Sequence, residues 1–138
     1  MRMKDRQLTA IIEQTEDNFA AYIEGLDGIV ATGKTLGEVK ARLLEAIDFF
    51  IETCESEGYD IPEELEGNFR INFQTDVRSL LNIYSGIFSK SGLERLTGIN
   101  QKQLWHYANG KSVPRRAQVL RIENALHELG QELISIHL

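Results

Sequence analysis

In the first half of the chain, hydrophobic residues alternate with polar residues over short segments. Residues 7–14 and 18–24 are rich in strand-forming residues, and the Thr-Glu-Asp stretch between them is typical of a turn, which predicts a β-hairpin. A short third strand is expected within residues 28–33, between glycine turns. Residues 68–73 alternate again and predict a fourth strand.

Between the third and fourth strands the spacing changes to that of a helix. Thr35 is placed to cap the helix, and Glu38, three residues later, completes the sequence pattern of a capping box. The apolar residues that follow recur at steps of three and four, at Leu36, Val39, Leu43, Ile47, Phe50 and Cys54. The predicted order is therefore βββαβ, with the helix covering one face of a small sheet.

From Asp76 onward the whole pattern is helical. A first helix is expected over residues 76–88, and Pro114 is expected to begin the last helix. The apolar positions of these two helices are Val77, Leu80, Leu81, Tyr84, Phe88, Val119, Ile122, Ala125, Leu126 and Leu129. The tail residues Leu133, Ile134, Ile136 and Leu138 fit either a helix end or a strand that pairs between subunits.

Two short helices are predicted between the first and the last. Ser89 is the expected N-cap of one, with Leu93 and Leu96 buried, and Asn100 is the expected N-cap of the other. In the second helix, Leu104 and Tyr107 are three positions apart and are expected to pack inward. Gly98 is expected in the turn between the two helices, and Gly110 is expected to end the second.

Charge divides the chain at the place where the pattern changes. Residues 1–75 contain 16 acidic and 7 basic residues, a net charge of −9, whereas residues 76–138 contain 5 acidic and 8 basic residues, a net charge of +3. Such a difference indicates two domains with different partners. With 42% hydrophobic and 26% charged residues, the chain is expected to fold. The absence of a signal-peptide pattern or a long apolar stretch predicts a cytoplasmic protein with no membrane partner.

No catalytic constellation stands out. Glu13, Asp17, Glu24 and Asp27 could in principle pair for acid–base or Mg²⁺ chemistry, but no histidine occurs before residue 106, and solvated acidic edges are favoured. An excess of carboxylates also suits a binding face for a basic protein. Cys54, the single cysteine, is expected in the core. Catalytic residues, metal ligands and cofactors are therefore all expected to be absent.

The two short helices suit reading of the DNA major groove. A glycine turn joins them, and the second exposes amides and cations; glutamine can contact adenine through two hydrogen bonds, and lysine can reach guanine or phosphate. An ordinary helical hairpin with a solvated face is the alternative that these residues leave open.

Residues 93–114 resemble the Cro/repressor-type helix-turn-helix. The match rests on Leu93, Gly98, Ile99, Leu104, Gly110, Lys111 and Pro114. The preceding region, with "YIEGLDGIVATGKTLGEVKARLLEAI", resembles the HicB antitoxins of the HicAB toxin–antitoxin systems. The resemblance implies an α+β chain, in which a βββαβ domain with a reduced ribonuclease H-like fold (1–75) binds a toxin and an all-α helix-turn-helix domain (76–138) binds DNA.

The resemblance also implies DNA-contacting residues. They are Lys90, Gln101, Lys102, Gln103, His106, Lys111, Arg115 and Arg116. Glu94 departs from the motif, because that position is usually small where the two helices approach, so its carboxylate must angle outward or find a donor. For Trp105 the sequence leaves two roles open: a core or dimer-interface residue, or a DNA contact.

The expected function is that of an antitoxin and autorepressor without enzymatic activity. Its partners would be operator DNA and a small basic HicA-like ribonuclease, and a homodimer or higher homo-oligomer is expected because one recognition helix reads only a few base pairs. One alternative is a stand-alone regulator whose N-terminal domain senses a ligand. Another is an active nuclease of ribonuclease H type, which would need clustered metal-binding carboxylates.

Overall fold

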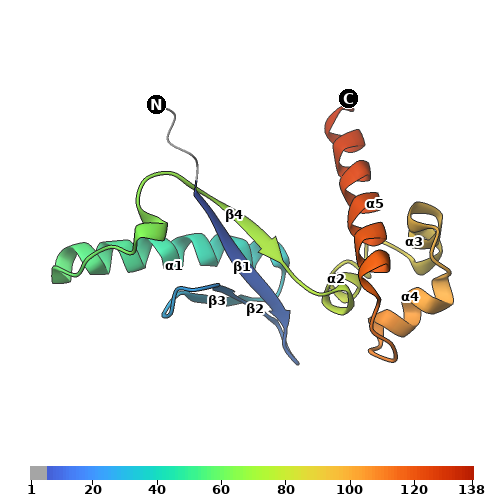
Figure 1. Cartoon of the computed structure of the whole chain (residues 1–138), viewed down its shortest axis with the longest axis horizontal. Helices are drawn as coiled ribbons and strands as arrows, with labels where there is room; N and C mark the ends of the chain where they lie inside the picture. The colour runs from blue at the N-terminus through green and yellow to red at the C-terminus, as the bar shows by residue number, and fades with distance from the viewer. Residues whose placement is uncertain (1–5) are drawn as a thin grey trace. The chain divides into compact units, whose positions relative to one another are not determined.

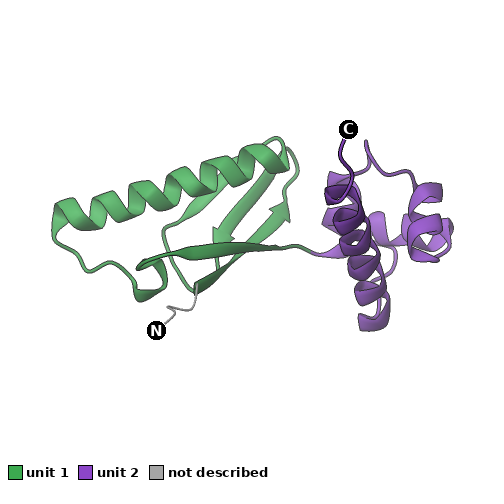
Figure 2. Ribbon diagram, turned by 90° about the horizontal axis from the view of Figure 1, so that it is seen from above, with its two compact units in different colours: residues 1–75 green, residues 76–138 purple. Residues whose placement is uncertain are grey.

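The computed structural model describes residues 6–138. The chain forms two compact units that divide between Thr75 and Asp76 (Figure 2). This division falls where the net charge of the sequence changes sign. The first unit combines helix and strand, and the second contains helices in all its regular elements, so that the chain as a whole is α+β.

The N-terminal unit is a mixed four-stranded sheet with one long helix (Figure 1). Its strands are β1 (Arg6–Gln14), β2 (Phe19–Ile23), β3 (Val30–Gly33) and β4 (Phe69–Gln74), in the spatial order β3-β2-β1-β4. The first three strands are antiparallel neighbours, and β4 pairs in parallel with β1. Helix α1 (Leu36–Glu57) lies between β3 and β4 in sequence, followed by the short 3₁₀ helix η1 (Glu63–Leu65). The predicted βββαβ order is confirmed.

Alternation along the strands places one set of side chains against α1. On β1 the buried residues are Leu8, Ala10 and Ile12, and on β2 they are Ala21 and Ile23. The α1 side of this core consists of Val39, Leu43, Ile47 and Cys54, as the predicted stripe requires. Leu36 and Phe50 of that stripe are only half-buried, at its margin.

Only one half of the capping box predicted at the start of α1 is formed. The backbone N–H of Glu38 donates to Oγ1 of Thr35 at 3.1 Å. The carboxylate of Glu38 pairs with Arg42, one turn further along, at 2.7 Å. Thr35 therefore caps the helix, while the side chain of Glu38 forms an i,i+4 ion pair.

The C-terminal unit has four helices: α2 (Val77–Ile83), α3 (Lys90–Thr97), α4 (Gln101–Ala108) and α5 (Arg116–Ile134). Its core is one cluster of buried residues drawn from all four helices and from the α3–α4 turn. The members are Val77, Leu81, Leu93, Ile99, Leu104, Tyr107, Ala108 and Ile122.

Three expectations for this unit were wrong in detail. The first helix ends at Ile83, not near residue 88, and the chain turns through Ser85 and Gly86, where glycine disfavours a helix. Leu96 is 39% exposed, because α3 turns Leu93 and Thr97 inward. The last helix begins at Arg116, two residues after Pro114.

The tail is not a strand: Leu133 and Ile134 form the end of a helix, and residues 136–138 lie in neither helix nor strand. Helix α5 continues to Ile134, and Ser135 follows as its C-cap. None of the helices in the described part of the chain is long and apolar enough to cross a membrane.

Candidate nucleic-acid interface

The turn between α3 and α4 is held by hydrogen bonds that begin in the core. Thr97, which is 5% exposed, donates from Oγ1 to the carbonyl of Leu93 at 2.7 Å, and the same oxygen accepts from the backbone N–H of Ile99 at 3.1 Å. Gly98 lies between them with a φ of 72°, a left-handed conformation that favours glycine. The buried Ile99 then anchors the chain just before α4 begins.

Two side chains hold the first turn of α4. Asn100 accepts a hydrogen bond from the backbone N–H of Lys102 at 2.8 Å, as expected of its N-cap. Glu94 on α3 accepts from the backbone N–H of Gln101 at 3.1 Å. Of the two outcomes expected for this carboxylate, finding a donor is the one observed. The two helices of the motif are therefore joined by a charged hydrogen bond in addition to their apolar contact.

The outer surface of α4 carries the predicted polar residues. Leu104, Tyr107 and Ala108 face the core, whereas Gln101 and Lys102 are exposed on the first turn. Their position at the start of a short helix leaves an amide and an ammonium group available to a ligand. Such a pair can form hydrogen bonds with base edges and phosphates.

Gln103 differs from its neighbours on α4. It is half-buried, and its Nε2 donates to Oγ of Ser112 in the loop after the helix at 3.0 Å. In this arrangement its amide joins α4 to the loop, so that Gln103 positions the loop that carries Lys111.

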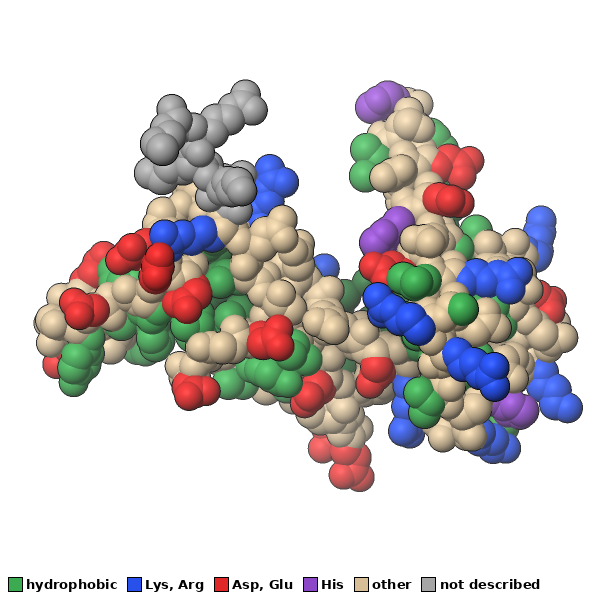
Figure 3. All heavy atoms as spheres, viewed as in Figure 1, with side chains coloured by type: hydrophobic (Ala, Val, Ile, Leu, Met, Phe, Trp, Pro, Cys, Tyr) green, Lys and Arg blue, Asp and Glu red, His purple; other side chains and the backbone are tan. Residues whose placement is uncertain are grey.

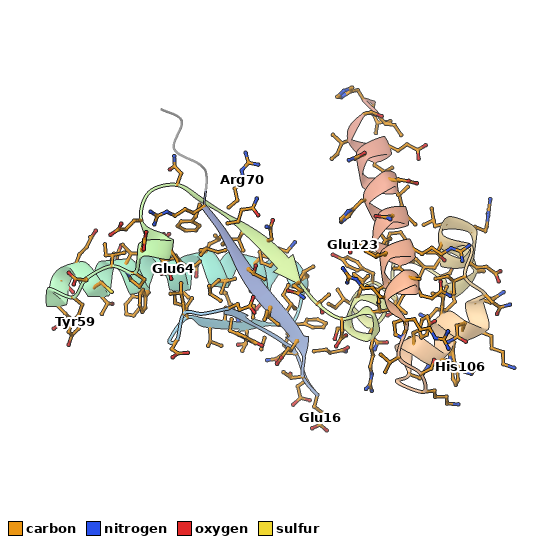
Figure 4. All side chains as sticks on the ribbon, in the orientation of Figure 1. Glu16, Tyr59, Glu64, Arg70, His106 and Glu123 are labelled. Atoms are coloured by element: carbon orange, nitrogen blue, oxygen red, sulfur yellow. The ribbon has the colours of Figure 1, made fainter. Side chains whose placement is uncertain are left out.

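Trp105, His106 and Lys111 form a cluster on the outer surface at the end of α4. The Nζ of Lys111 lies 4.4 Å from the centroid of the Trp105 ring, a cation–π contact. The rings of Trp105 and His106 are 5.6 Å apart, and His106 projects from α4 in Figure 4. Trp105 is 44% exposed, which excludes the core role that the sequence left open for it.

The remaining predicted contacts come from three separate places. Lys90 is half-buried at the first residue of α3, where Ser89 caps the helix by accepting from the N–H of Gly92. Arg115 and Arg116 are exposed at the start of α5. Lys111 joins the loop to α4 through its backbone N–H, which donates to the carbonyl of His106 at 2.9 Å.

Two arginines that the sequence analysis did not select also lie at this motif. A Cβ atom added to Gly98 would lie 2.7 Å from Nη2 of Arg121 on α5. A Cβ atom added to Gly110 would lie 2.9 Å from Nη1 of Arg78 on α2. Both glycines have a φ of 72°. Arg78 and Arg121 thus place guanidinium groups against the turns at the two ends of α4, and nothing in the local sequence around either residue signals this.

Charge is distributed over the two units as the sequence indicates. Figure 3 shows Lys and Arg side chains over the C-terminal unit and mainly Asp and Glu side chains over the N-terminal unit. In the N-terminal unit, α1 exposes Glu45, Asp48, Glu52 and Glu55 on the side opposite its buried stripe.

The carboxylates considered for chemistry are dispersed. Glu13 accepts from the Tyr22 hydroxyl at 3.4 Å, and desolvation together with the Glu13 charge raises the pKa of Tyr22 above its ordinary value of 10. Residues 6–138 contain no group of three or more His, Cys, Asp or Glu side chains that could hold a metal ion.

No protein-family model matches the chain, and neither a curated protein nor a solved structure matches it.

Proposed function

We propose that the C-terminal unit binds duplex DNA and that the first turn of α4 contacts bases in the major groove. The observation that carries this proposal is the exposure of Gln101 and Lys102 on a helix start that Asn100 and Glu94 hold in place. Lys111, Arg115 and Arg116 supply phosphate contacts on the flank of that helix.

The test compares the full chain with its two units. The full chain and residues 76–138 are titrated with duplex DNA at several salt concentrations, alongside residues 1–75. Binding by the first two, weakening steeply with salt as counterions are released, supports the proposal. Tight DNA binding by residues 1–75 alone contradicts the assignment of DNA binding to the C-terminal unit.

We further propose that the chain is an antitoxin and autorepressor of the HicB type. Its acidic unit, with a reduced ribonuclease H-like fold, then captures a small basic HicA-like ribonuclease. The net charge of −9 and the row of carboxylates on α1 support a basic protein partner, since complementary fields accelerate association. In this proposal the protein is not an enzyme and works in the cytoplasm.

The experiment is co-purification with the product of the neighbouring gene, followed by titration of residues 1–75 with that product. Binding and growth rescue support the antitoxin. A Mg²⁺-dependent cleavage assay on the purified full chain addresses the nuclease alternative, and activity that survives repeated purification contradicts the non-enzymatic proposal.

A ligand-sensing regulator is the second candidate, and one surface hollow favours it. The hollow is open to solvent, has a volume of about 320 Å³ and is lined by Arg6, Gln7, Leu8, Glu63 and Glu64. Nη2 of Arg6 lies 3.8 Å from Oε1 of Glu63, and its Nη1 has no hydrogen-bond partner among the described residues. If residues 1–75 fail to bind the neighbouring gene product and a small anion changes DNA affinity, the regulator replaces the antitoxin.

A further inference from the structure

Trp105 is a large apolar side chain on the outer surface of α4. It is 44% exposed, whereas Leu104, Tyr107 and Ala108 of the same helix are buried in the core cluster. The core of the unit therefore does not require an indole at this position, and its role has to lie at the surface.

Helical spacing places Trp105 beside the residues proposed to contact bases. Residues three and four positions apart are neighbours on a helix surface. Trp105 follows Gln101 by four residues and Lys102 by three, so its side chain lies on their side of α4, one turn further along. With a rise of about 1.5 Å per residue, Gln101 and Trp105 are about 6 Å apart along the helix axis, roughly the length of two base pairs.

Lys111 connects this ring with the proposed contacts to the DNA backbone. Its Nζ lies 4.4 Å from the centroid of the Trp105 ring. Because an ammonium group has three N–H donors, the contact with the ring leaves donors for a phosphate. In the proposed complex, Trp105 therefore lies at the side of the major groove, next to the sugar–phosphate backbone.

The base edges offer one apolar group to a side chain in this place. In the major groove, guanine, cytosine and adenine present hydrogen-bonding groups, and only thymine adds a methyl group, at C5. That methyl lies on the side of the base edge nearer the sugar, where a residue at the side of the groove can reach it. The apolar rim of an indole suits a methyl group, whereas it would cover polar groups of the other bases without replacing their hydrogen bonds to water.

We propose that Trp105 contacts the C5 methyl group of a thymine and thereby selects that base in the operator. The inference rests on the proposed binding of DNA by the C-terminal unit, and it adds an apolar contact that Gln101 and Lys102 do not supply. The thymine lies within about two base pairs of the base that Gln101 contacts.

The test removes the methyl group and nothing else. A duplex that the full chain binds is selected from a random library, and each thymine in it is then replaced in turn by deoxyuridine. Burial of one methyl group corresponds to about a fourfold change in affinity. Replacement of one thymine in each recognised site should weaken binding by about that factor, and the other replacements should have little effect.

Trp105→Ala tests whether the indole causes this difference. The variant should bind the thymine and deoxyuridine duplexes equally, because the side chain that contacts the methyl group is gone. Trp105→Phe keeps an aromatic ring and should retain part of the difference. Val113→Ala is the control: Val113 is an apolar residue of the loop after α4, is 87% exposed, and its variant should keep the whole difference. Circular dichroism checks that each variant is folded.

Three results would overturn this inference while leaving DNA binding intact. They are a selected duplex in which no replacement by deoxyuridine matters, an effect of the replacement that persists in Trp105→Ala, and an equal loss of the effect in Val113→Ala. If the full chain selects no duplex from the library, the proposed DNA binding fails, and this inference fails with it.

Fluorescence tests the location of Trp105 in the wild type and so does not depend on the folding of a variant. Trp105 is the only tryptophan in the chain, and the selected duplex should lower its quenching by acrylamide. Unchanged quenching in the complex contradicts the contact. Quenching that falls as the protein concentration rises, without DNA, would place the ring between two copies of the chain and would also contradict it.

Discussion

The carboxylate of Glu94 on α3 accepts a hydrogen bond from the backbone N–H of Gln101, the first residue of α4, at 3.1 Å. Helix N-termini have free N–H groups and favour negative charge. A residue that departs from the sequence motif is therefore used to satisfy a free N–H at the start of α4. In the proposed function, this contact sets the direction of Gln101 and Lys102.

Glu94→Ala is expected to lower the free energy of unfolding by about 1 kcal/mol, because one N–H at the start of α4 loses its partner. Glu94→Gln keeps a carbonyl acceptor and should lose less. Chemical denaturation of the full chain measures both. Glu128→Ala, an exposed change on α5, is the control and should have almost no effect. An equal loss of unfolding free energy for Glu128→Ala would show that the hydrogen bond from Gln101 to Glu94 does not stabilise the fold.

Gln101→Ala is expected to cost about 1 to 3 kcal/mol at the cognate operator while leaving nonspecific binding nearly unchanged, because only a base-edge contact is removed. Titrations against operator and scrambled duplexes measure the difference. Since Gln101 is exposed, the variant should fold normally. Equal losses on both duplexes would mean that the recognition surface lies elsewhere.

Lys111→Ala is expected to weaken binding to operator and scrambled DNA alike and to reduce the magnitude of the salt slope by about one, since a phosphate contact carries no sequence information. The substitution also removes the cation from the Trp105 ring. Because Trp105 is the only tryptophan, its fluorescence reports this change without DNA. An altered salt slope with unchanged fluorescence would contradict the contact between Lys111 and Trp105.

Charge reversal on α1 is expected to slow capture of a basic partner more than it speeds release, because charges at the rim of an interface act mainly on encounter. The variant is Asp48→Lys combined with Glu52→Lys, both exposed. Stopped-flow mixing with the neighbouring gene product measures both rates. Glu128→Lys, which changes charge in the other unit, is the control. If the control slows capture equally, net charge and not the acidic face controls the encounter.

Much of the fold follows from local pattern. The caps at Thr35, Ser89 and Asn100 each depend on a side chain that bonds to a backbone N–H two or three residues away. The alternating strands and the α1 stripe were likewise predicted, because strand and helix periods fix which residues share a face. The candidate DNA surface could be proposed for the same reason, since α4 is short and its inward residues were evident.

The rest depended on contacts between residues distant in sequence. The sequence by itself determined the order of the elements, their caps and most of the buried residues, because these depend on neighbours within a few positions. The tertiary structure alone decided that β4 pairs with β1, that Leu96 is exposed, and that Arg78 and Arg121 lie against the turns beside α4. It also decided that Ile122 of α5 is buried while Leu133, further along the same helix, is 57% exposed. A local pattern specifies which face of an element is apolar, but only packing against distant segments determines how much of that face is covered.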